Sequence, residues 1–195
     1  MNKTSKIIAQ ARCENRTALL ETEAKIICME YGIPVPKFKL ALCQNEAAKY
    51  ADEIGYPIVL KIVSADIIHK SDAGGVKVNL KSAAEVCQAY CAIFENAKKY
   101  NEKAKIAGVL VQEMAPAGIE VIVGAVKDPQ FGQTVMVGLG GVFVELLKDV
   151  NFRIAPINKE DALDMIMELK AYPLLNGFRG APPTDIEALI AILCS

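Results

Sequence analysis

The sequence predicts a fold of two lobes in which helices alternate with strands, in the α/β or α+β class. Three observations carry this prediction. Apolar, β-branched runs bounded by glycine and proline alternate with segments of helical periodicity. The 195 residues suffice for one large domain or two small ones. Hydrophobic residues make up 52% and charged residues 23%, which is the usage of a globular chain and excludes an intrinsically disordered one.

The N-terminal half contains clear signals for several elements. Residues 14–31 carry an apolar stripe at helical spacing, and Gly32 follows where a C-terminal cap belongs. Ser82 with Glu85 three residues later is a capping-box pattern, which predicts a helix that runs to about Tyr100. The remaining predicted elements of this half are strands over 37–42, 58–63 and 76–80 and a helix over 45–54.

The C-terminal half is richer in predicted strands, and glycines 138, 140 and 141 separate the last two of them. The predicted helix over 184–193 has Thr184 as its N-cap. The other predicted elements are strands over 108–114, 120–127, 134–139 and 143–147 and a helix over 159–170. We therefore expect the two lobes to divide near residue 108, into 1–107 and 108–195.

Composition excludes several classes of function. Lys and Arg total 22 and Asp and Glu total 23, so the net charge of -1 provides no basic field for nucleic acid or anionic lipid. Aromatic residues make up 6% and tryptophan is absent, which argues against base stacking. No apolar run approaches the ~18–20 residues of a membrane helix, and the mixed-charge start is unlike a signal peptide, so we expect a cytoplasmic protein without membrane contact. The six scattered cysteines are expected to be reduced, packed thiols.

Lys61 is the first candidate for a functional residue. It lies inside the apolar run 58–63, where burial of an unpaired ammonium group costs roughly several kcal/mol. Two interpretations stay open. The aliphatic stem of Lys61 packs in the strand while its ammonium group reaches water, or the lysine is held at a strand end to meet an anion such as a phosphate.

The loop after this strand contains His69, the single histidine of the chain. A lone loop histidine is usually a surface residue, but here Lys70 adds charge and Ser71 a hydroxyl group. Gly74 and Gly75 allow backbone amides to approach a ligand closely. Such a loop beside a cationic strand is typical of a phosphate cradle, with neither the Walker nor the dinucleotide spacing. A neutral imidazole can also accept a phosphoryl group near pH 7.

Carboxylates at strand ends are the remaining candidates. Glu113 and Met114 end a strand before a proline turn, an arrangement that suits recognition of an adenine edge. Glu120 opens the next strand and either accepts hydrogen bonds from ribose hydroxyls or is only solvated. Glu145 and Asp149 are spaced either to hold Mg²⁺ through oxygen ligands or to form a surface pair.

Together these segments resemble a known family. The set comprises Lys61, His69-Lys-Ser-Asp-Ala-Gly-Gly75, Gln112-Glu-Met114, Gly118-Ile-Glu120, the glycines of 138–141, Glu145, Asp149 and Arg153-Ile-Ala-Pro156. It resembles the β subunit of ADP-forming acetyl-CoA synthetase, the nucleotide-binding part of the acyl-CoA synthetase superfamily, which is related to the β subunit of succinyl-CoA synthetase. The resemblance runs from about residue 14 to the end. It implies an ATP-grasp fold, in which two α+β lobes grip a nucleotide.

The resemblance also implies a reaction and roles for single residues. The reaction is the reversible conversion of acyl-CoA, ADP and phosphate into acid, CoA and ATP, with Mg²⁺. A partner α subunit would carry the CoA-binding and phosphohistidine segments, in a hetero-oligomer. His69 would be a second phosphoryl relay and Lys61 the phosphate-binding lysine. Glu113 and Met114 would form the adenine hinge, and Glu120 would contact the ribose.

One departure from the family pattern concerns the metal. The family continues past a helix like 184–193 into a strand whose acidic and Asn-Pro residues bind Mg²⁺, and this sequence stops at Ser195. We therefore expect the C-terminal lobe to lack its last strands, and we assign no metal ligand. Two alternatives stay open for the function. One is a stand-alone ATP-grasp carboxylate ligase, which the same cradle and hinge would serve, and the other is a truncated or regulatory nucleotide-binding module, which the missing metal segment supports.

Overall fold

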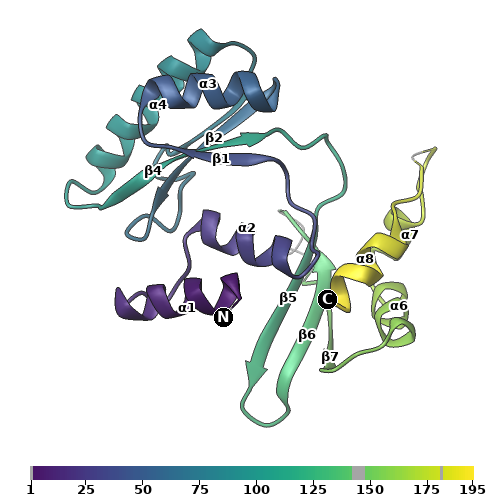
Figure 1. Cartoon of the computed structure of the whole chain (residues 1–195). Coiled ribbons are helices and arrows are strands. Elements are labelled where there is room, and N and C mark those ends of the chain that lie inside the picture. The colour runs from purple at the N-terminus through teal and green to yellow at the C-terminus, as the bar shows by residue number, and fades with distance from the viewer. Residues whose placement is uncertain (1, 142–147, 181) are drawn as a thin grey trace. The chain divides into compact units, whose positions relative to one another are not determined.

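The computed structural model describes residues 2–141, 148–180 and 182–195, and the chain divides into two compact units, Met1–Pro116 and Ala117–Ser195 (Figure 1). The first unit contains α1 (Lys3–Cys13), α2 (Glu21–Glu30), β1 (Phe38–Ala41), α3 (Gln44–Ile54), β2 (Ile58–Ser64), β3 (Val76–Leu80), α4 (Ala83–Tyr100) and β4 (Ile106–Glu113). The second contains β5 (Val121–Asp128), β6 (Gly132–Leu139), β7 (Val150–Ile154), α6 (Lys159–Met167), α7 (Tyr172–Leu175) and α8 (Ile186–Leu193). Each unit is thus an α+β arrangement.

The N-terminal sheet has the strand order β1-β4-β2-β3, and every neighbouring pair is antiparallel. Antiparallel pairing decides the fold class as α+β, because a βαβ crossover would have made the strands parallel. Strand β4 lies between β1 and β2 and is paired on both sides. The lobe boundary expected at 107/108 would separate this strand from its own sheet, so that expectation is corrected to 116/117.

Alternation along β2 gives the N-terminal sheet two different faces. Ile58, Leu60 and Ile62 point to one face and belong to the core formed with α3 and α4. These two helices cover that face in Figure 1. Val59, Lys61 and Val63 therefore point to the opposite face, on the side where α2 lies (Figure 1). The strand is buried on both faces except at Lys61, which is half-buried.

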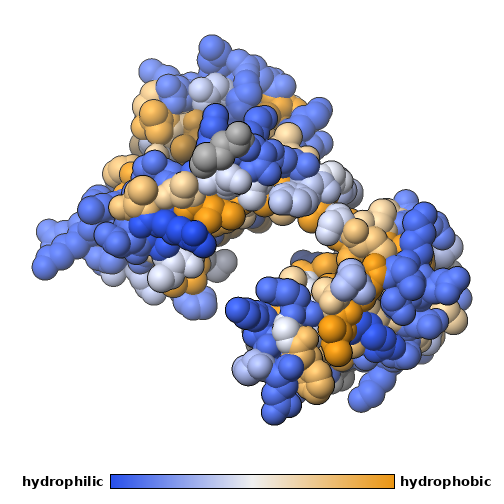
Figure 2. All heavy atoms as spheres, turned by 60° about the horizontal axis from the view of Figure 1, so that its bottom comes forward, coloured by the Kyte–Doolittle hydropathy of each residue, from blue (hydrophilic) through white to orange (hydrophobic). Residues whose placement is uncertain are grey.

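The C-terminal unit is built on the antiparallel sheet β5-β6-β7. One face, which carries Val137, packs against the inward sides of α6 and α8. The other face carries Val126, Phe152 and Ile154, which are 52%, 48% and 56% exposed. Figure 2 shows hydrophobic side chains, in orange, at the surface of this unit between hydrophilic ones. The unit therefore leaves an apolar sheet face accessible.

Most predicted elements are confirmed, with differences that have local causes. The helix expected over 14–31 begins only at Glu21, because Arg16 and Glu23 hold residues 14–20 in a non-helical linker after α1. Strand β7 and helix α7 were not predicted, since both are short and partly polar. The N-cap of α8 is Asp185 rather than Thr184, because its side chain accepts from the Ala188 amide. The predicted strand 143–147 lies outside the described residues.

Two further observations concern membrane-spanning helices and the cysteines. Over the parts of the chain that the structure describes, no helix combines the length and apolar character needed to cross a membrane. All six cysteines lie in described parts of the chain and are free thiols, two of them half-buried and four exposed.

Candidate functional site

The side of the N-terminal sheet that faces α2 brings three lysines around one carboxylate. Lys61 Nζ lies 2.9 Å from Glu21 Oε1, and Lys70 Nζ lies 3.2 Å from Glu21 Oε2. Lys25 Nζ lies 4.0 Å from Glu21 Oε1. We call these four residues the lysine cluster. It joins the first turn of α2, the middle of β2 and the loop between β2 and β3, so segments far apart in sequence meet here.

The lysine cluster carries an excess of positive charge in a partly desolvated place. The side chains of Lys25, Lys61 and Lys70 are 14%, 26% and 25% exposed. Among the described residues, Glu21 is the single carboxylate within 4.0 Å of these ammonium groups, so two positive charges are not neutralised. Burial lowers the pKa of Lys25, and the nearby charge of Lys61 lowers it further, although Glu21 acts in the opposite direction. Such a cluster favours an anionic ligand.

The charge of Glu21 is stabilised by its lysine neighbours. Burial alone would raise the pKa of Glu21, but the hydrogen bonds and charges of Lys61 and Lys70 together outweigh burial. The pKa of Glu21 is therefore below its ordinary value of 4.5, and the group is ionised at neutral pH.

We expect this carboxylate to contribute to stability in a pH-dependent way. Because the pKa of Glu21 is lower in the folded chain than in the unfolded chain, its stabilisation is complete above pH 4.5 and is lost as the pH falls through the folded-state pKa. Glu21→Gln should lower the free energy of unfolding by about 1–2 kcal/mol at pH 7, and by clearly less at about pH 3. Urea unfolding at both pH values measures this, and an equal cost at both would contradict it.

The loop from residue 65 to 75 holds the predicted phosphate-cradle residues, and its glycine amides bond within the loop itself. Gly74 N–H donates to the Ser71 carbonyl at 3.0 Å, and Gly75 N–H donates to the Lys70 carbonyl at 2.7 Å. A Cβ atom on Gly75 would lie 2.5 Å from a methyl carbon of Ile62, so glycine is needed here for the loop to close onto β2. The structure thus shows these glycines shaping the loop, and their direct contact with a ligand stays a prediction.

His69 and Ser71 are exposed on this loop, and Lys70 between them reaches into the lysine cluster. His69 directly precedes Lys70, so the two Cα atoms are about 3.8 Å apart. Glu21 and Lys70 also line a cavity of about 780 Å³, with residues 14–20, 63–68 and 105–107 as its other walls. The lysine cluster therefore contributes to the wall of a cavity, and the exposed His69 precedes Lys70 of that cluster in the chain.

The predicted adenine hinge lies at the end of β4. Glu113 N–H donates to the Lys37 carbonyl at 2.9 Å, and a carboxylate oxygen of Glu113 accepts from Lys37 N–H at 3.2 Å. Met114 N–H donates to the Pro57 carbonyl at 3.2 Å. These bonds fix the end of β4 against β1 and the entry to β2.

Gln112, the residue before this hinge, carries an unpaired acceptor on the same sheet face as Lys61. Its cross-strand partners are Phe38 and Val59, and Val59 shares a face with Lys61. Gln112 is 7% exposed, and none of the described residues donates to its Oε1. A buried acceptor without a donor is rare. The Gln112 Oε1 acceptor fits a ligand whose amino group can donate a hydrogen bond to it.

In the C-terminal unit, Glu120 meets the glycine cluster as a local site. The Glu120 carbonyl accepts from Gly140 N–H at 2.7 Å, and a Cβ atom on Gly141 would lie 2.6 Å from Glu120 Oε2. The exposed Glu120 carboxylate therefore lies close to the backbone of Gly140 and Gly141, which carry no side chains. The predicted Glu145–Asp149 pair is not supported, because buried Asp149 accepts the Lys170 and Ala171 amides at 3.0 and 2.8 Å, and Glu145 lies outside the described residues.

Comparison with known proteins shows the family to which this chain belongs. Residues 10–195 match the ATP-grasp domain family. The β subunit of acetate–CoA ligase [ADP-forming] I from Pyrococcus furiosus is 58% identical over 98% of this chain and 82% of that subunit. Isoform II from the same organism is 53% identical over 96% of this chain and 80% of that subunit. The chain belongs to the β-subunit family of ADP-forming acetyl-CoA synthetases. The family predicted from the sequence motifs is thus confirmed.

Solved structures of the ADP-forming acetyl-CoA synthetase family share this fold. Acetyl-coenzyme A synthetase 1 of Ca. Korarchaeum cryptofilum, in complex with coenzyme A and Ca-AMPCP, has a TM-score of 0.95 and 54% identity. The match covers 98% of this chain and 83% of that chain. A second structure of that protein, with coenzyme A and Mg-AMPPCP, has its phosphohistidine segment pointing towards the nucleotide binding site, with a TM-score of 0.86.

The family also occurs as part of larger chains. The 4-hydroxybutyrate–CoA ligase [ADP-forming] of Nitrosopumilus maritimus is 51% identical over 96% of this chain, but the match covers only 27% of that protein. The ATP-grasp part can therefore stand inside a single long polypeptide or in a separate β subunit.

Two residues of the site, Glu21 and Lys25, were missed by sequence reasoning, and Gln112 was recognised only as part of a motif, without a role of its own. Glu21 and Lys25 lie on α2, where charged residues four apart are normally assigned to the solvated face of a helix. The single indication for these two residues was that their helix must cover a sheet face, and that this face contains Lys61. Gln112 had a stronger signal, because it interrupts the apolar run of β4 as Lys61 interrupts that of β2.

The described residues do not define a magnesium site. Across residues 2–141, 148–180 and 182–195, no group of three or more acidic, histidine or cysteine side chains is arranged to hold a metal ion. We therefore assign Mg²⁺ no ligand among these residues and derive no step through it. The residues do fit the nucleotide, through the surplus of positive charge at the lysine cluster and the unpaired acceptor of Gln112.

Proposed function

We propose that this chain is the nucleotide-binding β component of an ADP-forming acetate–CoA ligase, and that it transfers a phosphoryl group between phosphohistidine and ADP or ATP. The single observation that carries the proposal is the lysine cluster beside the exposed His69. The family membership supports the reaction, and the cluster supports the assignment of its phosphoryl site to the face of β2.

In phosphoryl transfer, most residues of the site neutralise charge and position the reacting groups, and they form no covalent bond to the phosphoryl group. A transferring phosphoryl group spreads negative charge over its oxygens, and Lys61 and Lys70 are placed to donate hydrogen bonds to them. In the proposed relay, a neutral imidazole nitrogen of His69 attacks phosphorus as the phosphohistidine nitrogen of the partner leaves. A β-phosphate oxygen of ADP then attacks the same phosphorus, His69 leaves, and ATP forms.

The remaining predicted residues would position the nucleotide. Glu113 and Met114 would meet the adenine edge, Glu120 would accept from the ribose hydroxyls, and Ser71 with Gly74 and Gly75 would surround the phosphates. Magnesium, which accompanies the nucleotide analogue in the relative from Ca. Korarchaeum cryptofilum, would neutralise further phosphate charge when bound.

The proposal includes a partner. The relatives from Pyrococcus furiosus are named as β subunits, and the related structures contain coenzyme A. We propose that an α subunit supplies the CoA-binding and phosphohistidine segments, in a hetero-oligomer of the cytoplasm. The two units described above have no crossover-linked parallel strands, so they resemble no CoA-binding Rossmann lobe among the described residues.

The experiment measures nucleotide binding and phosphorylation of the full chain. ADP and ATP are titrated with Mg²⁺, and the intact mass is recorded at neutral pH with and without a candidate α subunit. We expect nucleotide binding by the chain alone and a phosphoryl adduct on His69 only with the α subunit. Acyl phosphate formation without a partner would favour a stand-alone ligase. Nucleotide binding without any adduct would favour a regulatory module, and absence of binding would overturn the proposal.

A further inference from the structure

The lysine cluster already contains an anion of its own. Glu21 Oε1 accepts a hydrogen bond from Lys61 Nζ at 2.9 Å, and Glu21 Oε2 forms an ion pair with Lys70 Nζ at 3.2 Å. These are the two ammonium groups that the proposed function assigns to the phosphoryl group. A carboxylate and a phosphoryl group are both multidentate anionic acceptors, so they compete for the same donors.

Space and charge both argue for competition. The Glu21 carboxylate is 19% exposed and lies between the two ammonium groups, where a bridging phosphoryl oxygen would have to lie. A phosphoryl dianion beside an ionised carboxylate would add like-charge repulsion in a partly desolvated place. The lysines keep Glu21 ionised, so protonation does not relieve this repulsion at neutral pH.

We propose that Glu21 is an internal competitor of the phosphoryl group: it bridges Lys61 and Lys70 in the free protein and gives up both contacts when a nucleotide phosphate or phosphohistidine arrives. This inference rests on the proposed function and names the regulation of the same site. While no ligand is bound, Glu21 keeps the two long lysine side chains together and neutralises part of their charge. When a phosphoryl group leaves, Glu21 replaces it, which accelerates release in a reaction that must run in both directions.

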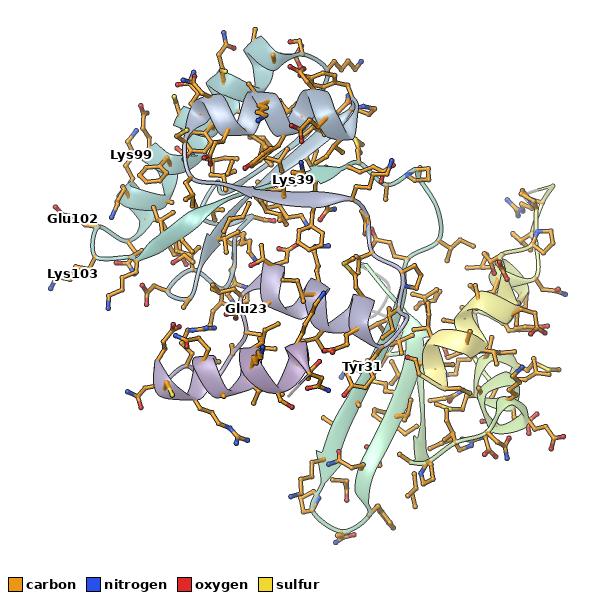
Figure 3. The ribbon with its side chains drawn as sticks, in the orientation of Figure 1. Glu23, Tyr31, Lys39, Lys99, Glu102 and Lys103 are labelled. Carbon is orange, nitrogen blue, oxygen red and sulfur yellow. The ribbon has the colours of Figure 1, made fainter. Side chains whose placement is uncertain are left out.

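The chain offers a matched control for removal of such a carboxylate. Glu53 on α3 also lies between two lysines, since it pairs with Lys39 and lies 4.0 Å from Lys49. Lys39, labelled on β1 in Figure 3, is on the opposite face of the sheet from Lys61, next to α3. Glu53→Gln therefore makes the same chemical change outside the proposed site.

The test compares the binding of ADP with that of adenosine, which lacks phosphates, in the full chain with Mg²⁺. Glu21→Gln and Glu21→Asp should tighten ADP binding roughly fivefold and slow ADP dissociation. Glutamine removes the competing charge, and the shorter side chain of aspartate draws it back from the two lysines. Adenosine affinity should stay unchanged, and Glu53→Gln should behave like the unmodified chain. In the Lys61→Met background, Glu21→Gln should no longer tighten ADP binding.

The possible outcomes separate the two proposals. Weaker ADP binding in both Glu21 variants would show that Glu21 positions the lysines, and would overturn the competition. Unchanged ADP binding, or equal tightening of adenosine, would overturn it as well. Absence of ADP binding in the unmodified chain and in both Glu21 variants would overturn the proposed function itself. Circular dichroism of each variant shows that a loss of binding is not a loss of fold.

Discussion

Lys61→Met is expected to lower phosphoryl transfer between phosphohistidine and ADP by about 10²–10³-fold. Methionine replaces the unbranched stem of the lysine with one of similar shape, so the apolar packing of β2 survives, but the substitution removes the ammonium group from the centre of the lysine cluster. Lys70 cannot replace it, because Lys70 comes from a loop whereas Lys61 is fixed by pairing with β3 and β4. Single-turnover transfer from a phosphorylated α subunit to ADP measures the effect.

Two further variants make this result specific for Lys61. Lys61→Arg keeps the charge but not the compact shape of the ammonium group, and it should restore only part of the activity. Lys39→Met removes a lysine from the same sheet on the opposite face, beside Glu53 of α3, and should keep activity within about twofold. If Lys61→Met retains more than half of the transfer rate, Lys61 does not bind the phosphoryl group.

His69→Asn is expected to abolish the phosphoryl adduct on this chain and to lower the overall rate at least ~100-fold. The amide of asparagine can fill a similar place and form hydrogen bonds, but it has no nucleophilic nitrogen. Because His69 is exposed on a loop closed by its own backbone hydrogen bonds, the exchange should leave the fold intact. Intact-mass measurement at neutral pH, combined with the steady-state rate of the complex, tests both expectations.

The control for His69 is a substitution on the same loop. Asp72 is exposed like His69, and Asp72→Asn should keep both the adduct and the rate within about threefold. A normal overall rate in His69→Asn would show that the phosphoryl group passes directly from the partner to ADP. A normal adduct mass in His69→Asn would show that another side chain is the acceptor.

The order of elements was predictable from the sequence because it depends on local patterns. The apolar run of β2, the capping serine of α4 and the glycine after α2 each act within a few residues, and these three elements are present. The family was predictable because several short motifs occur together in a fixed order along the chain. Lys61 was recognisable as an anomaly because it breaks an apolar run, whatever its partners are.

The tertiary structure alone decided which residues share a site. Strand order is a property of hydrogen bonds between distant segments, so only the sheet showed that β4 belongs to the N-terminal unit. No local pattern singled out Glu21 or Lys25 on α2, and only the fold brings Glu21 to Lys61, 40 positions away in the chain. Only the structure showed that the amides of Gly74 and Gly75 donate to carbonyls of their own loop, and their contact with a ligand stays a prediction. Sequence thus determined the elements and the chemistry available, because both are local, whereas the partner of each charge depended on how the chain folds back on itself.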